Sequence, residues 1–127
     1  MVSELIMVVD DNPVNMRLAC ALLRRNGYEV RTAEDAREAL ALLRTVHPHL
    51  ILMDIQLPDI DGLTLTRRLK ADPATQDIVI VALTAFAMKG DEQKARDAGC
   101  NGYIPKPLET RTFINTMKRF LEAEKIF

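Results

Sequence analysis

Several features that mark large classes of proteins are missing from this sequence. No apolar run approaches the about 20 residues that cross a bilayer. Residues 1–9 lack the basic segment and cleavage site of a secretory signal peptide. The net charge of −1 provides no field that would attract nucleic acid or a membrane surface. We therefore expect a cytoplasmic protein that neither inserts into a membrane nor binds nucleic acid directly.

Cysteine, aromatic residues and glycine are also scarce. Cys20 and Cys100 have no metal-binding or redox spacing, so we expect ordinary reduced thiols. There is no tryptophan, aromatic residues make up 5% of the chain, and no expected strand is followed by a glycine-rich phosphate loop. These absences argue against a small FMN-binding protein of the flavodoxin type, whose class of fold would otherwise be compatible with the chain.

The most informative stretch is an apolar run that ends in a carboxylate. Residues 50–53 are Leu-Ile-Leu-Met, Asp54 follows directly, and residues 55–58 end in a proline that turns the chain away. A short unbroken apolar run bounded by turn signals is typical of a strand buried on both faces of a parallel sheet. Asp54 would then lie at the C-terminal end of that strand, which is where open parallel sheets bind ligands.

Strand and helix patterns alternate about five times along the chain. The remaining strands are expected at residues 5–9, 28–32, 78–84 and 101–104, and the helices at about 13–26, 33–43, 62–71, 88–98 and 108–122. Gly90 would lie inside the fourth helix and weaken it, because an interior glycine costs about 1 kcal/mol relative to alanine. The pattern predicts one α/β domain over residues 1–127, with a doubly wound five-stranded parallel sheet and helices on both faces.

Acidic residues end two of the expected strands. Asp10 and Asp11 follow the first strand as Asp54 ends the third, and the C-terminal ends of parallel strands share one edge of the sheet. Three converging carboxylates repel one another unless they are protonated or bridged by a cation, and an all-oxygen site with room for water suits Mg²⁺. Thr84 ends a further strand at the same edge, and Lys106 follows another. Together these groups predict a phosphoryl-transfer site in which Asp54 is the nucleophile and forms an aspartyl phosphate.

Each of these motifs also has a purely structural interpretation. Asp10, Asp11 and Asn12 precede Pro13 and can act simply as a helix cap. Asp54 alone can be a turn residue, and Lys106 with the proline after it can be an ordinary loop. Only the ordered set favours the chemical interpretation.

The ordered set resembles the signature of the receiver domain of two-component response regulators: Asp10, Asp11, Asp54, Thr84, Lys106 and Pro107. The resemblance covers essentially the whole chain and implies a flavodoxin-like sheet with strand order 2-1-3-4-5. It implies that Asp54 accepts a phosphoryl group from a phosphohistidine donor and that Lys106 contacts that group. It also implies a Mg²⁺ site, at which Mn²⁺ can substitute, formed by Asp10, Asp11, Asp54 and the backbone carbonyl of Gln56.

The same resemblance implies a conformational switch. Thr84 would close on the phosphoryl group, Tyr103 would move with it, and the small Ala85 would leave the approach open. The peptide between Lys106 and Pro107 would be cis. The protein would then be a phosphoacceptor and not an enzyme, with at most self-phosphorylation and self-dephosphorylation. Its partners would be a histidine kinase or histidine phosphotransfer protein and a downstream protein target, and it would be a monomer or weak homodimer.

Residues 52–58 and 84–92 are similar to single-domain response regulators of the DivK type, which suggests control of the cell cycle or cell fate. Asp10 stands where those proteins often have Glu, and either carboxylate can serve a metal. Two roles stay open: a stand-alone switch that signals only by protein contact, and a phosphorelay intermediate or a receiver separated from a hybrid histidine kinase. An aspartate-nucleophile phosphatase uses similar groups, but Gln56 stands where such enzymes usually have a second Asp.

Overall fold

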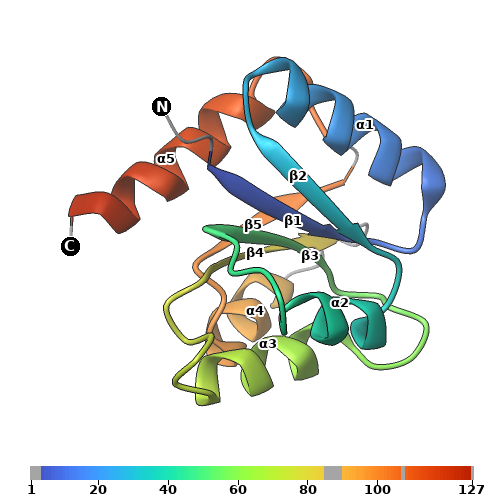
Figure 1. Cartoon of the computed structure of the whole chain (residues 1–127), viewed down its shortest axis with the longest axis vertical. Helices are drawn as coiled ribbons and strands as arrows, with labels where there is room; N and C mark the ends of the chain where they lie inside the picture. Colours follow the sequence, from blue (N-terminus) through green and yellow to red (C-terminus); the bar gives the residue numbers. More distant parts are fainter. Residues whose placement is uncertain (1–3, 85–89, 107, 127) are drawn as a thin grey trace.

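The computed structural model describes residues 4–84, 90–106 and 108–126 (Figure 1). In this part of the chain five parallel strands form one sheet in the order β2-β1-β3-β4-β5. The strands are β1 (Leu5–Val9), β2 (Glu29–Ala33), β3 (Leu50–Asp54), β4 (Val79–Thr84) and β5 (Gly102–Pro105). The predicted strand order is confirmed.

Helices cover both faces of the sheet. Figure 1 shows α1 (Pro13–Arg25) and α5 (Phe113–Ile126) on one face, and α2 (Ala36–Leu42), α3 (Gly62–Ala71) and α4 (Asp91–Ala98) on the other. Each face has its own apolar cluster between the sheet and its helices. The doubly wound α/β architecture expected from the sequence is therefore confirmed. None of the helices described has the length and apolar character of a membrane span.

The central strand β3 is buried along its whole length. Ile51 and Met53 belong to the cluster beneath α2, α3 and α4, and Leu50 and Leu52 to the cluster beneath α1 and α5. Burying each such side chain contributes about 1.5–3 kcal/mol, so β3 is held firmly from both sides. Asp54, its last residue, is therefore delivered to the sheet edge by a strand that is packed on both faces.

Three helices begin later than the sequence pattern predicted. Helix α2 begins at Ala36 and not at residue 33, because Ala33 is the last residue of β2 and Asp35 is the helix cap. Gly90 precedes α4 and has a left-handed φ of 104°, so it does not weaken the interior of that helix, contrary to the prediction. The predicted start of this helix near residue 88 falls outside the described residues. Helix α5 begins at Phe113 and not near residue 108, because the chain first makes a turn in which the Phe113 N–H donates to the Glu109 carbonyl over 2.9 Å.

Gly62 lets α3 begin directly against the backbone that carries the end of β3. A Cβ atom at this position would overlap the carbonyl oxygen of Asp54 and would lie 2.9 Å from the Cα atom of Ile55. The Gly62 N–H donates to the Ile55 carbonyl over 2.8 Å, which closes the loop between β3 and α3. No other residue fits here without moving the backbone next to Asp54.

We expect Gly62→Ala to lower the free energy of unfolding by about 2 kcal/mol or more, because the new methyl group meets backbone atoms that cannot rotate away. Gly27→Ala is the matched control, since Gly27 has a φ of 88° but open space around it. It should cost only the about 1–2 kcal/mol of a left-handed alanine. Urea unfolding measures both, and a Gly62→Ala protein as stable as wild type would contradict this account of the loop.

Candidate functional site

Three carboxylates meet at the C-terminal edge of the sheet. One oxygen from each of Asp10, Asp11 and Asp54 lies within 4.8 Å of the others. Asp10 is 1% exposed and Asp54 is 4% exposed, whereas Asp11 is open to solvent. The convergence expected from the two strand ends is therefore present in the folded chain.

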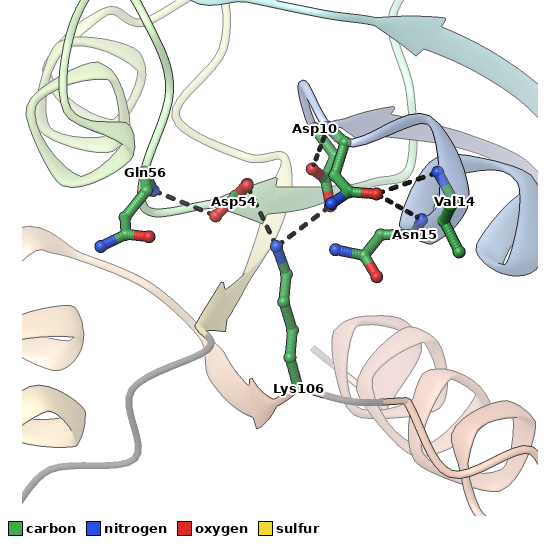
Figure 2. A network of polar contacts seen from close by, with 7 residues as sticks. Asp10, Val14, Asn15, Asp54, Gln56 and Lys106 are labelled. Atoms are coloured by element: carbon green, nitrogen blue, oxygen red, sulfur yellow. Dashed lines mark hydrogen bonds and ion pairs between the residues drawn. The ribbon is translucent and has the colours of Figure 1, made fainter.

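Lys106 lies between the two buried carboxylates (Figure 2). Its Nζ atom donates to Oδ2 of Asp54 over 3.1 Å and forms an ion pair with Oδ2 of Asp10 at 3.3 Å. The Lys106 N–H donates to the Thr84 carbonyl over 2.7 Å, so the end of β4 positions this lysine. The Lys106 ammonium is thus paired with two buried carboxylates, and its single positive charge cannot balance both negative charges.

Asp10 is left with spare bonding capacity. Its Oδ1 accepts a hydrogen bond from the Asn12 N–H over 2.9 Å. Its Oδ2 is buried and has no hydrogen-bond partner among the described residues. The ion pair with Lys106 therefore offsets the cost of burying this oxygen. A buried carboxylate oxygen without a hydrogen bond is costly, and a bound cation would relieve that cost.

The helix-cap interpretation of residues 10–12 and the acidic-cluster interpretation hold together. Asn12 caps α1, since its Oδ1 accepts from the backbone N–H groups of Val14 at 2.9 Å and Asn15 at 3.1 Å (Figure 2). Pro13 occupies the first helical position, where no N–H is needed. Because Asn12 performs the capping, the carboxylates of Asp10 and Asp11 stay available at the sheet edge.

The environment of Asp54 favours its neutral form more than water does. Burial away from water is the main cause that raises the pKa of Asp54 from its ordinary 3.8 to about 6, and the negative charge of Asp10 contributes to the same rise. Hydrogen bonds from the Gln56 N–H, at 3.0 Å from Oδ1, and from Lys106 oppose it. A divalent cation beside these carboxylates would therefore help to keep Asp54 ionised and nucleophilic.

An open cleft of about 380 Å³ gives access to Asp54. Its lining residues are Asp11, Asn12, Asn15, Asp54, Gln56, Leu57, Pro58 and Lys106. Sequence analysis missed Asn15 as a lining residue and treated Asn12 only as a cap. Both residues lie at the start of the helix that follows two acidic residues, and this position is the signal that could have identified them. The cleft leaves space for water, which a Mg²⁺ site with few protein ligands needs.

Of the predicted switch residues, the structure describes Thr84 and Tyr103. Thr84 is the buried last residue of β4, and Tyr103 in β5 is partly buried against the apolar cluster beneath α2, α3 and α4. Ala85 and Pro107 lie outside the described residues, and so does the peptide bond between Lys106 and Pro107. Their expected roles remain predictions.

The cysteines take no part in this site. Burial raises the pKa of the Cys20 and Cys100 thiols, so the reactive thiolate is disfavoured in both. Both cysteines are free and buried, as expected for structural thiols.

The raised pKa of Asp54 predicts a pH-dependent stability in metal-free protein. The folded state holds this proton more tightly than the unfolded chain, so the neutral carboxyl contributes stability below about pH 4 that is lost as pH rises through about 6. Asp54→Asn mimics the neutral form at every pH. We expect its advantage in unfolding free energy over wild type to grow by about 2–3 kcal/mol between about pH 4 and about pH 7.5.

Urea unfolding in the presence of a chelator measures this difference. Asp97→Asn is the control, because Asp97 is an exposed carboxylate on α4. Measuring both variants over the same pH range separates the effect of removing an exposed carboxylate from the effect of removing the buried one. A constant difference between Asp54→Asn and wild type over the same range would contradict the description of the buried cluster.

Comparison with known proteins agrees with this geometry. Residues 6–118 match the family model of the response regulator receiver domain. The chain is 48% identical over 116 residues to the polar-differentiation response regulator DivK of Brucella ovis. The aligned residues cover 91% of this chain and 94% of DivK. Aspartate phosphorylation and Mg²⁺ binding at an acidic site are typical of this family.

Solved structures show the same similarity. A CheY-like receiver domain protein from Methanospirillum hungatei has a TM-score of 0.89 and 27% identity, with 98% of each chain covered. The receiver domain of a sensor histidine kinase from Pseudomonas aeruginosa has a TM-score of 0.86 and 34% identity, covering 95% of this chain and 99% of that one, and carries a magnesium ion in its active-site cleft. The chain belongs to the receiver domain family of two-component response regulators.

Proposed function

We propose that Asp54 accepts a phosphoryl group from the phosphohistidine of a histidine kinase or histidine phosphotransfer protein. The observation that carries this proposal is a buried carboxylate at the end of β3, 3.1 Å from the Lys106 ammonium and at the base of an open cleft. A carboxylate oxygen of Asp54 forms the new bond to phosphorus as the bond from phosphorus to the donor imidazole nitrogen breaks. The imidazole leaves with the bonding electron pair.

The residues around Asp54 have the chemistry that this transfer requires. Lys106 already contacts Asp54, so its positive charge lies where the phosphoryl oxygens would come to rest. Asp10, Asp11, Asp54 and the backbone carbonyl of Gln56 would hold Mg²⁺ or Mn²⁺. The three clustered carboxylates and the oxygen of Asp10 without a hydrogen bond support a hard cation at this place. The cation would supply positive charge against the transferring group.

The consequence of phosphorylation in this proposal is a shift between two conformations. The Thr84 hydroxyl would close on the phosphoryl group and Tyr103 would move with it, as the family resemblance implies. Ala85 and Pro107 are expected, on the same resemblance, to belong to this switch. A partner that binds one conformation better than the other then receives the signal. In this role the protein is a phosphoacceptor, with at most self-phosphorylation and self-dephosphorylation.

Residues 1–127 would act as one receiver domain, in the cytoplasm, as a monomer or weak homodimer. The alignment with 94% of DivK favours a stand-alone switch that signals by protein contact, and the relative's name suggests control of cell polarity or cell fate. A phosphorelay intermediate, or a receiver separated from a hybrid kinase, is the second candidate. The similarity to the receiver of a sensor histidine kinase supports that alternative.

Intact mass after incubation with Mg²⁺ and acetyl phosphate tests the acceptor. Wild type should gain one phosphoryl group, and a chelator added beforehand should abolish the gain. Asp54→Asn should gain none, because an amide cannot form the acyl phosphate. A labelled Asp54→Asn protein would mean another acceptor, and an unlabelled wild type that nevertheless binds Mg²⁺ would point to a receiver regulated without phosphate.

A further inference from the structure

The loop between β3 and α3, residues 55–61, carries Gln56 at the edge of the cleft. Both ends of this loop are held by hydrogen bonds. The Ile55 N–H donates to the Leu83 carbonyl over 3.0 Å, and Asp61 caps α3 by accepting from the Leu63 N–H over 3.0 Å. The middle of the loop, which forms the wall of the cleft with Leu57 and Pro58, needs a separate anchor.

Asp59 provides that anchor by reaching across to α2. Its Oδ1 accepts from the N–H of Ala36 over 3.0 Å, and its Oδ2 accepts from the N–H of Arg37 over 2.9 Å. Oδ1 also accepts from the N–H of Ile60 over 2.9 Å, which fixes the side chain in the loop itself. The bonds from the Ala36 and Arg37 N–H groups therefore join the middle of the loop to α2. Figure 1 shows the loop passing beside the start of α2.

Two aspartates cap the N-terminus of α2. The first N–H groups of a helix have no partner within the helix and need an acceptor. Asp35 is the helix's own cap and accepts from the Glu38 N–H over 2.8 Å. Asp59, from a distant part of the chain, accepts from the N–H groups of Ala36 and Arg37, the two residues that precede Glu38. These hydrogen bonds lower the pKa of Asp59, so the side chain is an anion held at the positive end of the helix.

We propose that Asp59 is a positioning residue for the metal and phosphoacceptor site, and that it acts by holding the 55–61 loop against the N-terminus of α2. This inference rests on the proposed function, because its purpose is to keep Gln56 in reach of the cation. Gln56 has two tasks that depend on the loop: its N–H orients the Asp54 carboxylate, and its carbonyl is the expected fourth protein ligand. A loop that loses its tie to α2 would present that carbonyl in many positions.

Asp35→Ala is a matched control for Asp59→Ala. Both substitutions remove an acidic cap from the same end of the same helix, but Asp35 makes its cap bond within α2. If Asp59 were only a helix cap, the two variants would behave alike. Asp59→Asn tests rescue, because an amide keeps one oxygen acceptor and loses the charge.

The experiment measures the Mg²⁺ dissociation constant by calorimetry and the hydrogen exchange of the Gln56, Leu57 and Ile60 amides in metal-free protein. Asp59→Ala should weaken Mg²⁺ binding about tenfold, the lower end of what lost supporting contacts around a metal ligand cost. Its loop amides should exchange faster than in wild type. Asp35→Ala should lower the melting temperature but leave the Mg²⁺ constant and the loop amides unchanged, and Asp59→Asn should lie between Asp59→Ala and wild type.

Three results would overturn the inference. If Asp59→Ala bound Mg²⁺ as wild type does, Asp59 would be a cap and nothing more. If Asp35→Ala weakened Mg²⁺ binding as much as Asp59→Ala, the effect would come from the stability of α2. If wild type bound no Mg²⁺, the proposed function would fail and the role of Asp59 with it, which separates that failure from the first two.

Discussion

The site depends on the repulsion between buried carboxylates at one edge of the sheet. Asp10 and Asp54 are nearly inaccessible to water and share the single ammonium of Lys106, and Asp11 adds a third negative charge beside them. Desolvation and the charge of Asp10 together raise the pKa of Asp54 to about 6. This concentration of negative charge is unfavourable by itself, and a divalent cation bound beside the three carboxylates would relieve the repulsion.

The rest of the fold keeps these groups in place. β3 is packed on both faces, and this packing fixes the position of Asp54 at the edge of the sheet. Asn12 caps α1, so Asp10 and Asp11 are not consumed as caps, and the end of β4 holds Lys106 through the Thr84 carbonyl. Gly62 allows α3 to start against the backbone of Asp54, and Asp59 ties the intervening loop to α2. Local structure and site geometry are thus maintained by the same contacts.

Sequence reasoning succeeded where the signal was local. The apolar run of residues 50–53 is enough to identify a buried strand, and Asp54 directly after it is thereby placed at a ligand-binding edge. It failed where a residue's role depended on its exact position relative to a helix end, or on a contact with a residue far away in the sequence. Gly90 was assigned to a helix interior because a glycine that precedes a helix and one inside it look alike in sequence. The contact of Asp59 with Ala36 spans 23 residues and follows from no periodicity. The roles of Ala85 and Pro107 still rest on family resemblance alone.

The most direct test of the carboxylate repulsion is the dependence of stability on Mg²⁺ at neutral pH. If the cation relieves the repulsion, the unfolding free energy of wild type should rise by about 1.4 kcal/mol for each tenfold increase in Mg²⁺ above the dissociation constant. Asp11→Asn, which removes the exposed member of the cluster and leaves the buried pair intact, should lose most of that rise. A wild-type stability that does not respond to Mg²⁺, or an equal response in Asp11→Asn, would contradict this role for the cluster.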